Sequence, residues 1–151
     1  MKSEKEMLVH SKTLGHSIGI LLKRFTRMCE RGGREIGLTG AQGKVLAYIF
    51  IEEQWQDMFQ KDIEEEFDIR RSSATGILQS LERDGMIYRV SVPQDARLKK
   101  IVLTDKARQI QKTVLNGLEL LEVKLKGDLA EEEIKAFVQT CDRIGKNIES
   151  F

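Results

Sequence analysis

Apolar residues recur at intervals of three and four along most of the chain, a spacing that predicts α-helices. The first predicted helix covers about residues 6–30. Its apolar side chains share one face, at Leu14, Ile18, Leu21, Leu22, Phe25 and Met28. We expect the glycine pair Gly32-Gly33, followed by Gly37, to break the chain after this helix. A second helix is expected to begin at Thr39, because Gln42 three residues later completes a capping box.

The middle of the chain predicts two short helices joined by a tight turn, over residues 60–67 and 70–84. Gly85 suits the left-handed position that often follows a helix. One face of the second helix is apolar, at Ile77, Leu78 and Leu81. The other face carries small polar side chains, at Ser72, Ser73, Thr75, Gln79 and Ser80. A β-hairpin is predicted next, with arms over 88–92 and 99–103 and a basic tip over 93–97 that reads as a wing.

Two long helices are predicted after the hairpin. Thr104 is a good N-cap for the first of them. Its apolar stripe approximates a heptad repeat, at Ile110, Val114, Leu118, Leu121 and Leu125. The last helix covers about residues 130–148. Its stripe consists of Ile134, Phe137, Val138, Cys141, Ile144 and Ile148, and we expect Cys141 to be a core residue.

These elements predict a mainly α fold with a small β-hairpin wing. A length of 151 residues suits one domain, 1–151, with a winged helix-turn-helix module over about 39–103. The helical regions, about 6–30 and 104–148, carry more apolar surface than so small a module can cover. We therefore expect two chains to pack together, although the stripes could instead fold back on their own chain. The expected dimer interface comprises Leu14, Ile18, Leu121, Leu125, Phe137, Ile144 and Ile148.

Charge is unevenly distributed along the chain. The net charge is only +1. Residues 69–100, however, hold seven basic and three acidic side chains, so this segment carries +4 and the remainder −3. A local basic surface on a nearly neutral protein fits a footprint on phosphates. The polar N-terminus and the absence of an apolar run near the roughly 20 residues that span a bilayer predict a cytoplasmic protein without membrane contact.

Candidate chemistry is sparse. The two histidines, His10 and His16, do not share a helix face, so we predict no metal site. Neither a nucleophile beside a usable histidine nor a phosphate-binding glycine loop is present, so we predict no enzyme activity and no cofactor. Cys29 lies near Arg27 and Arg31, which suits a redox sensor, but a small hydrophobe in the core is the simpler interpretation.

Three segments, taken together and in register, resemble the multiple-antibiotic-resistance regulator (MarR) family of winged-helix repressors. They are Asp95-Ala96-Arg97 followed by Leu103-Thr104, Gln60-Lys61-Asp62-Ile63, and residues 81–87. The resemblance extends over nearly the whole chain. Four positions depart from the family's usual residues, namely Phe59 for Thr, Val92 for Asp, Gly76 for Arg and Ala107 for Gly. Gly76 removes a side chain that would otherwise contact bases.

The resemblance implies a homodimeric repressor that reads a pseudo-palindromic operator in double-stranded DNA. Arg97 would enter the minor groove while Asp95 holds the wing loop, and the second helix of the module would enter the major groove. The predicted DNA-contacting set is Gln60, Lys61, Arg70, Arg71, Ser72, Ser73, Thr75, Gln79, Arg89, Asp95, Arg97 and Lys99. The polar members on the helix could equally be only a solvated face.

The resemblance also implies a cleft for a small-molecule effector between the module and the helical region. Tyr48, Trp55 and Phe59 could line that cleft or belong to the core. An alternative function is a helical dimeric adaptor whose winged module binds another protein. The basic segment and the Asp95–Arg97 tip favour DNA over this alternative.

Overall fold

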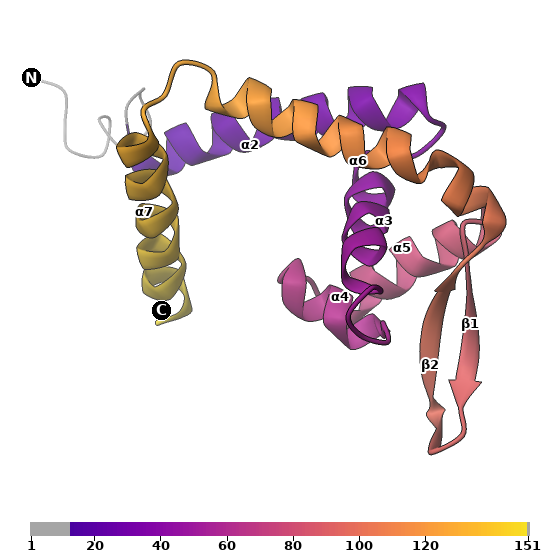
Figure 1. Ribbon diagram of the computed structural model, residues 1–151. Coiled ribbons are helices and arrows are strands. Elements are labelled where there is room, and N and C mark those ends of the chain that lie inside the picture. The colour runs from indigo at the N-terminus through magenta and orange to yellow at the C-terminus, as the bar shows by residue number, and fades with distance from the viewer. Residues whose placement is uncertain (1–12, 151) are drawn as a thin grey trace, which may run out of the picture. The chain divides into compact units, whose positions relative to one another are not determined.

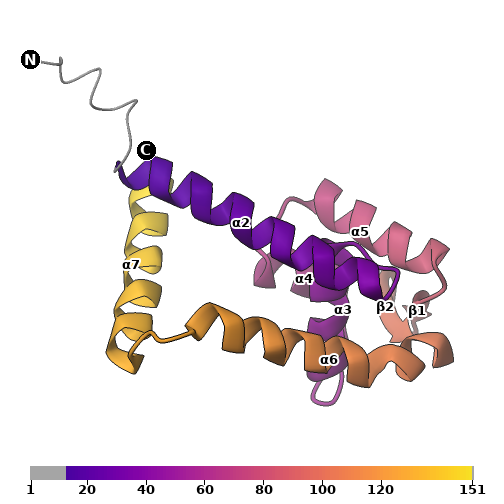
Figure 2. The ribbon, with the colours of Figure 1, turned by 90° about the horizontal axis from the view of Figure 1, so that it is seen from above.

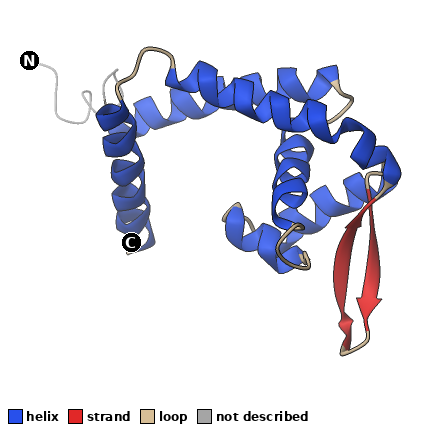
Figure 3. Cartoon of the chain, in the orientation of Figure 1, coloured by secondary structure: helices blue, strands red, loops and turns tan. Residues whose placement is uncertain are grey.

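Six helices and one β-hairpin make up residues 13–150, the part of the chain that the computed structural model describes (Figures 1 and 3). They are α2 (Leu14–Glu35), α3 (Gly40–Glu52), α4 (Gln60–Glu66), α5 (Arg71–Arg83), β1 (Ile87–Val92), β2 (Asp95–Leu103), α6 (Asp105–Lys126) and α7 (Glu131–Glu149). This confirms a mainly α fold with a small hairpin. The predicted helical residues 6–12, and His10 with them, lie outside the described residues. The chain divides into two compact units, one up to Gly117 and one from Leu118, and each is described by itself.

The first helix is longer than we predicted from the positions of its glycines. Helix α2 runs through Gly32 and Gly33 to Glu35, so the expectation that this pair breaks the chain was wrong. A glycine inside a helix costs only about 1 kcal/mol relative to alanine, which packing can offset. The turn that follows the helix is formed instead at Gly37. Its φ of 73° allows the amides of Gly37 and Leu38 to donate to the carbonyls of Arg34 and Gly33. This pairing is a Schellman motif.

Gly33 is required by this turn, and its neighbour is not. A Cβ at Gly33 would lie 2.5 Å from the Leu38 carbonyl oxygen, whereas one at Gly32 would meet nothing within 4 Å. We expect Gly33→Ala to lower the free energy of unfolding by about 1–3 kcal/mol, because the backbone must shift to admit the methyl group. Gly32→Ala should instead raise it by up to ~1 kcal/mol through helix propensity. Urea unfolding of both variants checks this, and equal changes would contradict it.

Helix α3 is the centre of the first unit. Its N-cap is Thr39, and Thr39 and Gln42 form the predicted capping box. Figures 1 and 2 show α3 together with α2 and α5, and it packs against both. Its fully buried side chains form the core together with those of α4, α5 and the loop between α3 and α4. The core contains Val45, Leu46, Ile49, Phe50, Met58, Ile63, Leu78 and Leu81.

The hairpin has a tighter turn than the sequence indicated. Strand β2 begins at Asp95, which pairs with Val92, so the turn comprises only Pro93 and Gln94. The expected five-residue tip over 93–97 was wrong. The register jumps from Ser91–Lys99 to Val92–Asp95, which leaves residues 96–98 unpaired on the β2 side. The extra residues on the β2 side form a bulge, and the strand begins four residues before the predicted start at Lys99.

A residue outside the hairpin also pairs with β2, which the sequence did not indicate. The Ile101 amide donates to the Met58 carbonyl at 2.7 Å, and the two residues form an antiparallel bridge. At the other end of β2, the Thr104 hydroxyl donates to the Gly85 carbonyl at 2.7 Å and accepts from the Ala107 amide at 3.2 Å. Thr104 therefore caps α6, as predicted, and ties its start to the end of α5.

The second unit comprises the end of α6 and all of α7. Helix α7 has no buried residue, although its apolar side chains share one face. Phe137 is 55% exposed and Ile148 69% exposed. Cys141 is also exposed, so the expectation that it is a core residue was wrong for the single chain. None of the helices within residues 13–150 is long and apolar enough to cross a membrane.

Candidate nucleic-acid interface

Helices α4 and α5 form the predicted helix-turn-helix. Phe59, at the N-cap of α4, has no side-chain group that can cap, but the Asp62 carboxylate accepts from the Phe59 amide at 2.8 Å. Asp62 therefore compensates in part for the absence of the family's usual threonine. The turn between the helices contains Asp68, whose φ of 46° lies in the left-handed region that few residues other than glycine, asparagine and aspartate adopt. Gly85 follows α5 at a φ of 71°, as predicted.

The polar face of α5 is exposed at most of the expected positions. Ser72, Ser73 and Gln79 are exposed, while Thr75 is half-buried. The exception is Ser80, which was expected on this face. It lies toward α3, where its Oγ accepts from the Gln42 Nε2 at 2.7 Å. The opposite face is buried through Ala74, Leu78 and Leu81.

Gln42 connects α3 to the end of α5. It is only 3% exposed, and its Nε2 donates to Ser80 and, at 2.8 Å, to the Asp84 carboxylate. Its Oε1 accepts from the Thr39 amide at 2.8 Å. The sequence identified Gln42 as part of a cap but gave no signal for the contact with α5. This buried amide fixes the position of α5 because each of its polar atoms has a partner there or at Thr39.

Several cations of the basic segment are paired within the fold. Arg89, predicted as a DNA contact, donates two hydrogen bonds to the Glu82 carboxylate, at 2.6 and 3.0 Å. The hydrogen bond to Glu82 is the main cause that raises the pKa of Arg89. Lys100 pairs with Asp57 at 2.5 Å, and Arg83 lies 3.7 Å from the Asp84 carboxylate. Outside this segment Lys61, another predicted DNA contact, pairs with Glu65 at 3.2 Å.

Four cations of the same segment keep their charge available. No carboxylate among residues 13–150 lies within 4.0 Å of the charged nitrogens of Arg70, Arg71, Arg97 or Lys99. Arg70 and Arg71 stand at the N-terminus of α5, and Arg97 and Lys99 stand near the hairpin tip. We call these four residues the open cations. Uncompensated charge at two separate points is what a footprint on a polyanion requires.

The shape of the hairpin tip depends on Asp95. Its Oδ1 accepts from the Arg97 amide at 2.9 Å, which closes the unpaired stretch of the bulge. The Lys99 Nζ donates to the Ser91 Oγ across the hairpin at 2.5 Å. In Figure 1 the hairpin extends away from α4 and α5, with this tip at its far end. The hydrogen bond to Asp95 therefore holds the Arg97 backbone close to the tip of the hairpin.

The three aromatic residues considered for an effector cleft have different surroundings. Tyr48 packs edge-to-face on Phe67, with ring centroids 5.7 Å apart. Burial, and then the nearby charges of Glu66 and Glu52, raise the pKa of Tyr48. Phe59 is half-buried, and Trp55 is 80% exposed. Two of the three side chains are therefore half-buried and one is exposed, so they do not share one kind of surface.

Cys29 is half-buried and packs against α3. A Cβ added at Gly40 would lie 3.0 Å from the Cys29 Cβ, so the two helices are in close contact there. This contact fits the packing interpretation of Cys29. Within residues 13–150 no cluster of three or more histidine, cysteine or acidic side chains could hold a metal ion.

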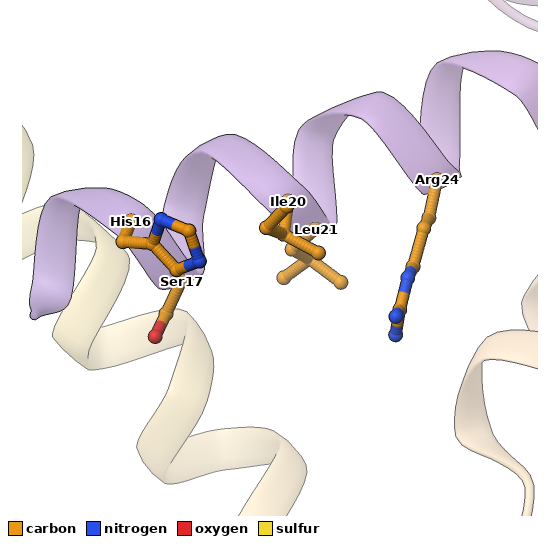
Figure 4. Close-up of a pocket in the computed structure, with 5 residues that line it drawn as sticks. All are labelled: His16, Ser17, Ile20, Leu21 and Arg24. Carbon is orange, nitrogen blue, oxygen red and sulfur yellow. The ribbon is translucent and has the colours of Figure 1, made fainter. Parts of the chain in front are cut away.

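A hollow of about 310 Å³ lies beside α2 (Figure 4). Its lining residues lie along one side of the helix, and they are His16, Ser17, Ile20, Leu21 and Arg24. Polar groups stand at both ends of this row and two aliphatic side chains stand between them. The hollow is a feature of α2 and is separate from the helix-turn-helix.

A helix-turn-helix followed by a hairpin wing defines a winged helix-turn-helix protein, and comparison with known proteins shows which family it resembles. The model of the MarR family matches residues 36–98. The HTH-type transcriptional regulator BilQ of Clostridioides difficile is 25% identical over 128 residues, which cover 85% of this chain and 84% of BilQ.

Solved structures agree with this assignment. The transcription regulator MarR from Oenococcus oeni is 25% identical, with a TM-score of 0.79, over 89% of this chain and 99% of that one. The MepR–DNA complex of S. aureus has the same fold, with a TM-score of 0.80 and 21% identity, over 90% of this chain and 96% of that one. Over residues 36–98, and in its overall fold, the chain is similar to transcriptional regulators of the MarR family.

Proposed function

We propose that this protein is a homodimeric, sequence-specific DNA-binding repressor whose release from DNA is controlled by a small molecule. The observation that carries the proposal is the placement of the open cations, at the two ends of an exposed polar surface. Arg70 and Arg71 stand where α5 begins, Arg97 and Lys99 stand near the hairpin tip, and the polar face of α5 continues from the first pair. This is the arrangement of a recognition helix with a flanking wing.

Each part of this surface has a role in the proposed complex. The polar face of α5, with Ser72, Ser73, Thr75 and Gln79, enters the major groove. Arg70 and Arg71 hold phosphates, helped by unpaired amides in the first turn of α5. Gln60 and Lys61 lie at the start of the neighbouring helix α4 and contact the backbone.

The wing contributes unequally along its length. Arg97 enters the minor groove with Asp95 shaping the tip, and Lys99 contacts phosphate. Arg89 belongs to the predicted set, but its pairing with Glu82 favours a different role. We assign it to holding β1 against α5, since its guanidinium already donates two hydrogen bonds to the carboxylate of Glu82.

The dimer is supported by apolar surface that the single chain leaves uncovered. Leu14 and Ile18 of α2, Leu125 of α6, and Phe137 and Ile148 of α7 are all exposed. Leu121 and Ile144 are half-buried and complete the proposed interface. A second copy of the chain is the occupant we propose, because a twofold-symmetric protein matches a pseudo-palindromic operator.

Repression and control by a small molecule are proposed on the ground of similarity to the MarR family. The hollow beside α2 is the first place to look for the effector, since its aliphatic centre and polar ends suit a small amphipathic molecule.

The experiment that tests the proposal is a titration of duplex DNA from the region upstream of the protein's own gene, at several salt concentrations. With three open cations per chain assigned to phosphates (Arg70, Arg71 and Lys99), a dimer would contact roughly six phosphates. Its affinity should then fall by about 10³- to 10⁵-fold between 50 and 200 mM salt. A scrambled duplex should bind more weakly at every salt concentration. Failure to bind any duplex would favour the adaptor alternative, in which the module binds protein.

A further inference from the structure

The contact between Gln60 and Thr75 joins the two helices of the helix-turn-helix at its exposed surface. Gln60 is the first residue of α4, and its Nε2 lies 3.0 Å from the Thr75 Oγ1 on α5. The same nitrogen lies 2.9 Å from the Glu64 Oε1 and 3.4 Å from the Arg71 carbonyl oxygen. A hydroxyl oxygen, a carboxylate oxygen and a backbone carbonyl oxygen therefore surround one amide nitrogen.

These partners settle which way the Gln60 amide faces. A carboxylate and a backbone carbonyl can only accept hydrogen bonds, so the group between them must be the NH₂ and not the oxygen. The Thr75 Oγ1 then receives a hydrogen bond from Gln60. Its own hydrogen must be donated elsewhere, because a hydroxyl has a single hydrogen to give.

The usual acceptor for that hydrogen does not receive it. A helical threonine commonly donates to the carbonyl four residues earlier, as Thr140 does to Ala136 at 2.7 Å. For Thr75 this carbonyl belongs to Arg71, and Gln60 approaches it instead. Within residues 13–150 the Thr75 hydroxyl donates to no protein acceptor.

We propose that Gln60 fixes the Thr75 hydroxyl as a hydrogen-bond donor, so that this position selects a base whose major-groove edge presents an acceptor. The acceptor is a purine N7, a guanine O6 or a thymine O4, and cytosine, which presents a donor amine, is disfavoured. Gln60 is a positioning residue in this arrangement, and Thr75 makes the contact. The inference rests on the proposed function, because it requires that α5 enters the major groove.

The test uses operator duplexes in which one major-groove acceptor at a time is deleted. Substituting 7-deazapurines removes N7, 2-aminopurine for guanine removes O6, and 5-methyl-2-pyrimidinone for thymine removes O4. We expect one position in each half-site where the deletion weakens wild-type binding about three- to tenfold, the effect of one hydrogen bond. The analogue that gives this effect identifies the acceptor.

Four variants then separate the roles of the two residues. Thr75→Val, which keeps the shape but lacks the hydroxyl, should lose the sensitivity to that analogue, and Thr75→Ser should keep it. Gln60→Leu should lose it as well, since the Thr75 hydroxyl then no longer receives the hydrogen bond that directs its own hydrogen outward. The double variant with both changes should resemble Thr75→Val alone. Thr113→Val makes the same chemical change at an exposed position of α6 and should behave as the wild type.

Two outcomes overturn the inference while leaving the proposed function intact. One is a Thr75→Val variant that retains the wild-type response to every analogue. The other is a Gln60→Leu variant that retains it while Thr75→Val does not. A wild-type protein that binds no duplex overturns the proposed function itself. Thermal unfolding of each variant distinguishes a loss of folding from a loss of base selectivity.

Discussion

Placing a charge on the apolar face of α7 should convert the dimer to a monomer and abolish tight operator binding. We expect Phe137→Glu combined with Ile148→Glu to have this effect, because both side chains are exposed in the single chain and belong to the proposed interface. A monomer binds only one half-site, so the loss of linkage should weaken operator binding by about 10²- to 10⁴-fold. This is the largest effect that we predict for a variant.

Sedimentation equilibrium measures the assembly directly. The wild type should have twice the monomer mass of 17.3 kDa, and the variant should have that mass itself. Gln139→Glu is the matched control, since Gln139 lies on the opposite face of α7 and also gains a negative charge. A doubly substituted protein that remains a dimer and binds the operator normally would rule out the proposed interface.

Removing the cation at the hairpin tip should have the second-largest effect. Arg97→Ala should weaken binding by ~1–3 kcal/mol on operator and scrambled duplexes alike, and should lower the salt slope by about one unit for each chain. The reason is that Arg97 contacts the minor groove and backbone, where little sequence information is available. Lys112→Ala, which removes an exposed cation of α6, should change neither quantity.

The measurement is a set of titrations of both variants at four or more salt concentrations. An Arg97→Ala protein with unchanged affinity and slope would exclude the wing from the interface. Recognition would then depend on α5 alone.

Elements with local signals could be predicted from the sequence. The start of α3 follows from Thr39 and Gln42, the end of α5 from Gly85, and the start of α6 from Thr104, and the structure confirms all three. These signals work because each cap is formed by residues within a few positions of one another. The positions of the apolar residues located α4 and α7 within one residue of their observed bounds.

Features that depend on distant contacts could not be predicted. Gly33 stays helical because the turn at Leu38 packs on it, and no residue within α2 reveals that contact. Met58 forms a β-bridge only because Ile101 returns to meet it. For the same reason, the sequence could place Arg89 in a basic segment but could not show that Glu82 occupies its guanidinium.

The central claim is that two copies of α5 and the wing read a twofold-symmetric site, and hydroxyl-radical footprinting of the operator tests it most directly. We expect two symmetry-related protected segments whose centres lie about 10 base pairs, or a multiple of that, apart. We also expect outer minor-groove protections that disappear with Arg97→Ala. A single asymmetric footprint, or minor-groove protection that persists without Arg97, would contradict this claim.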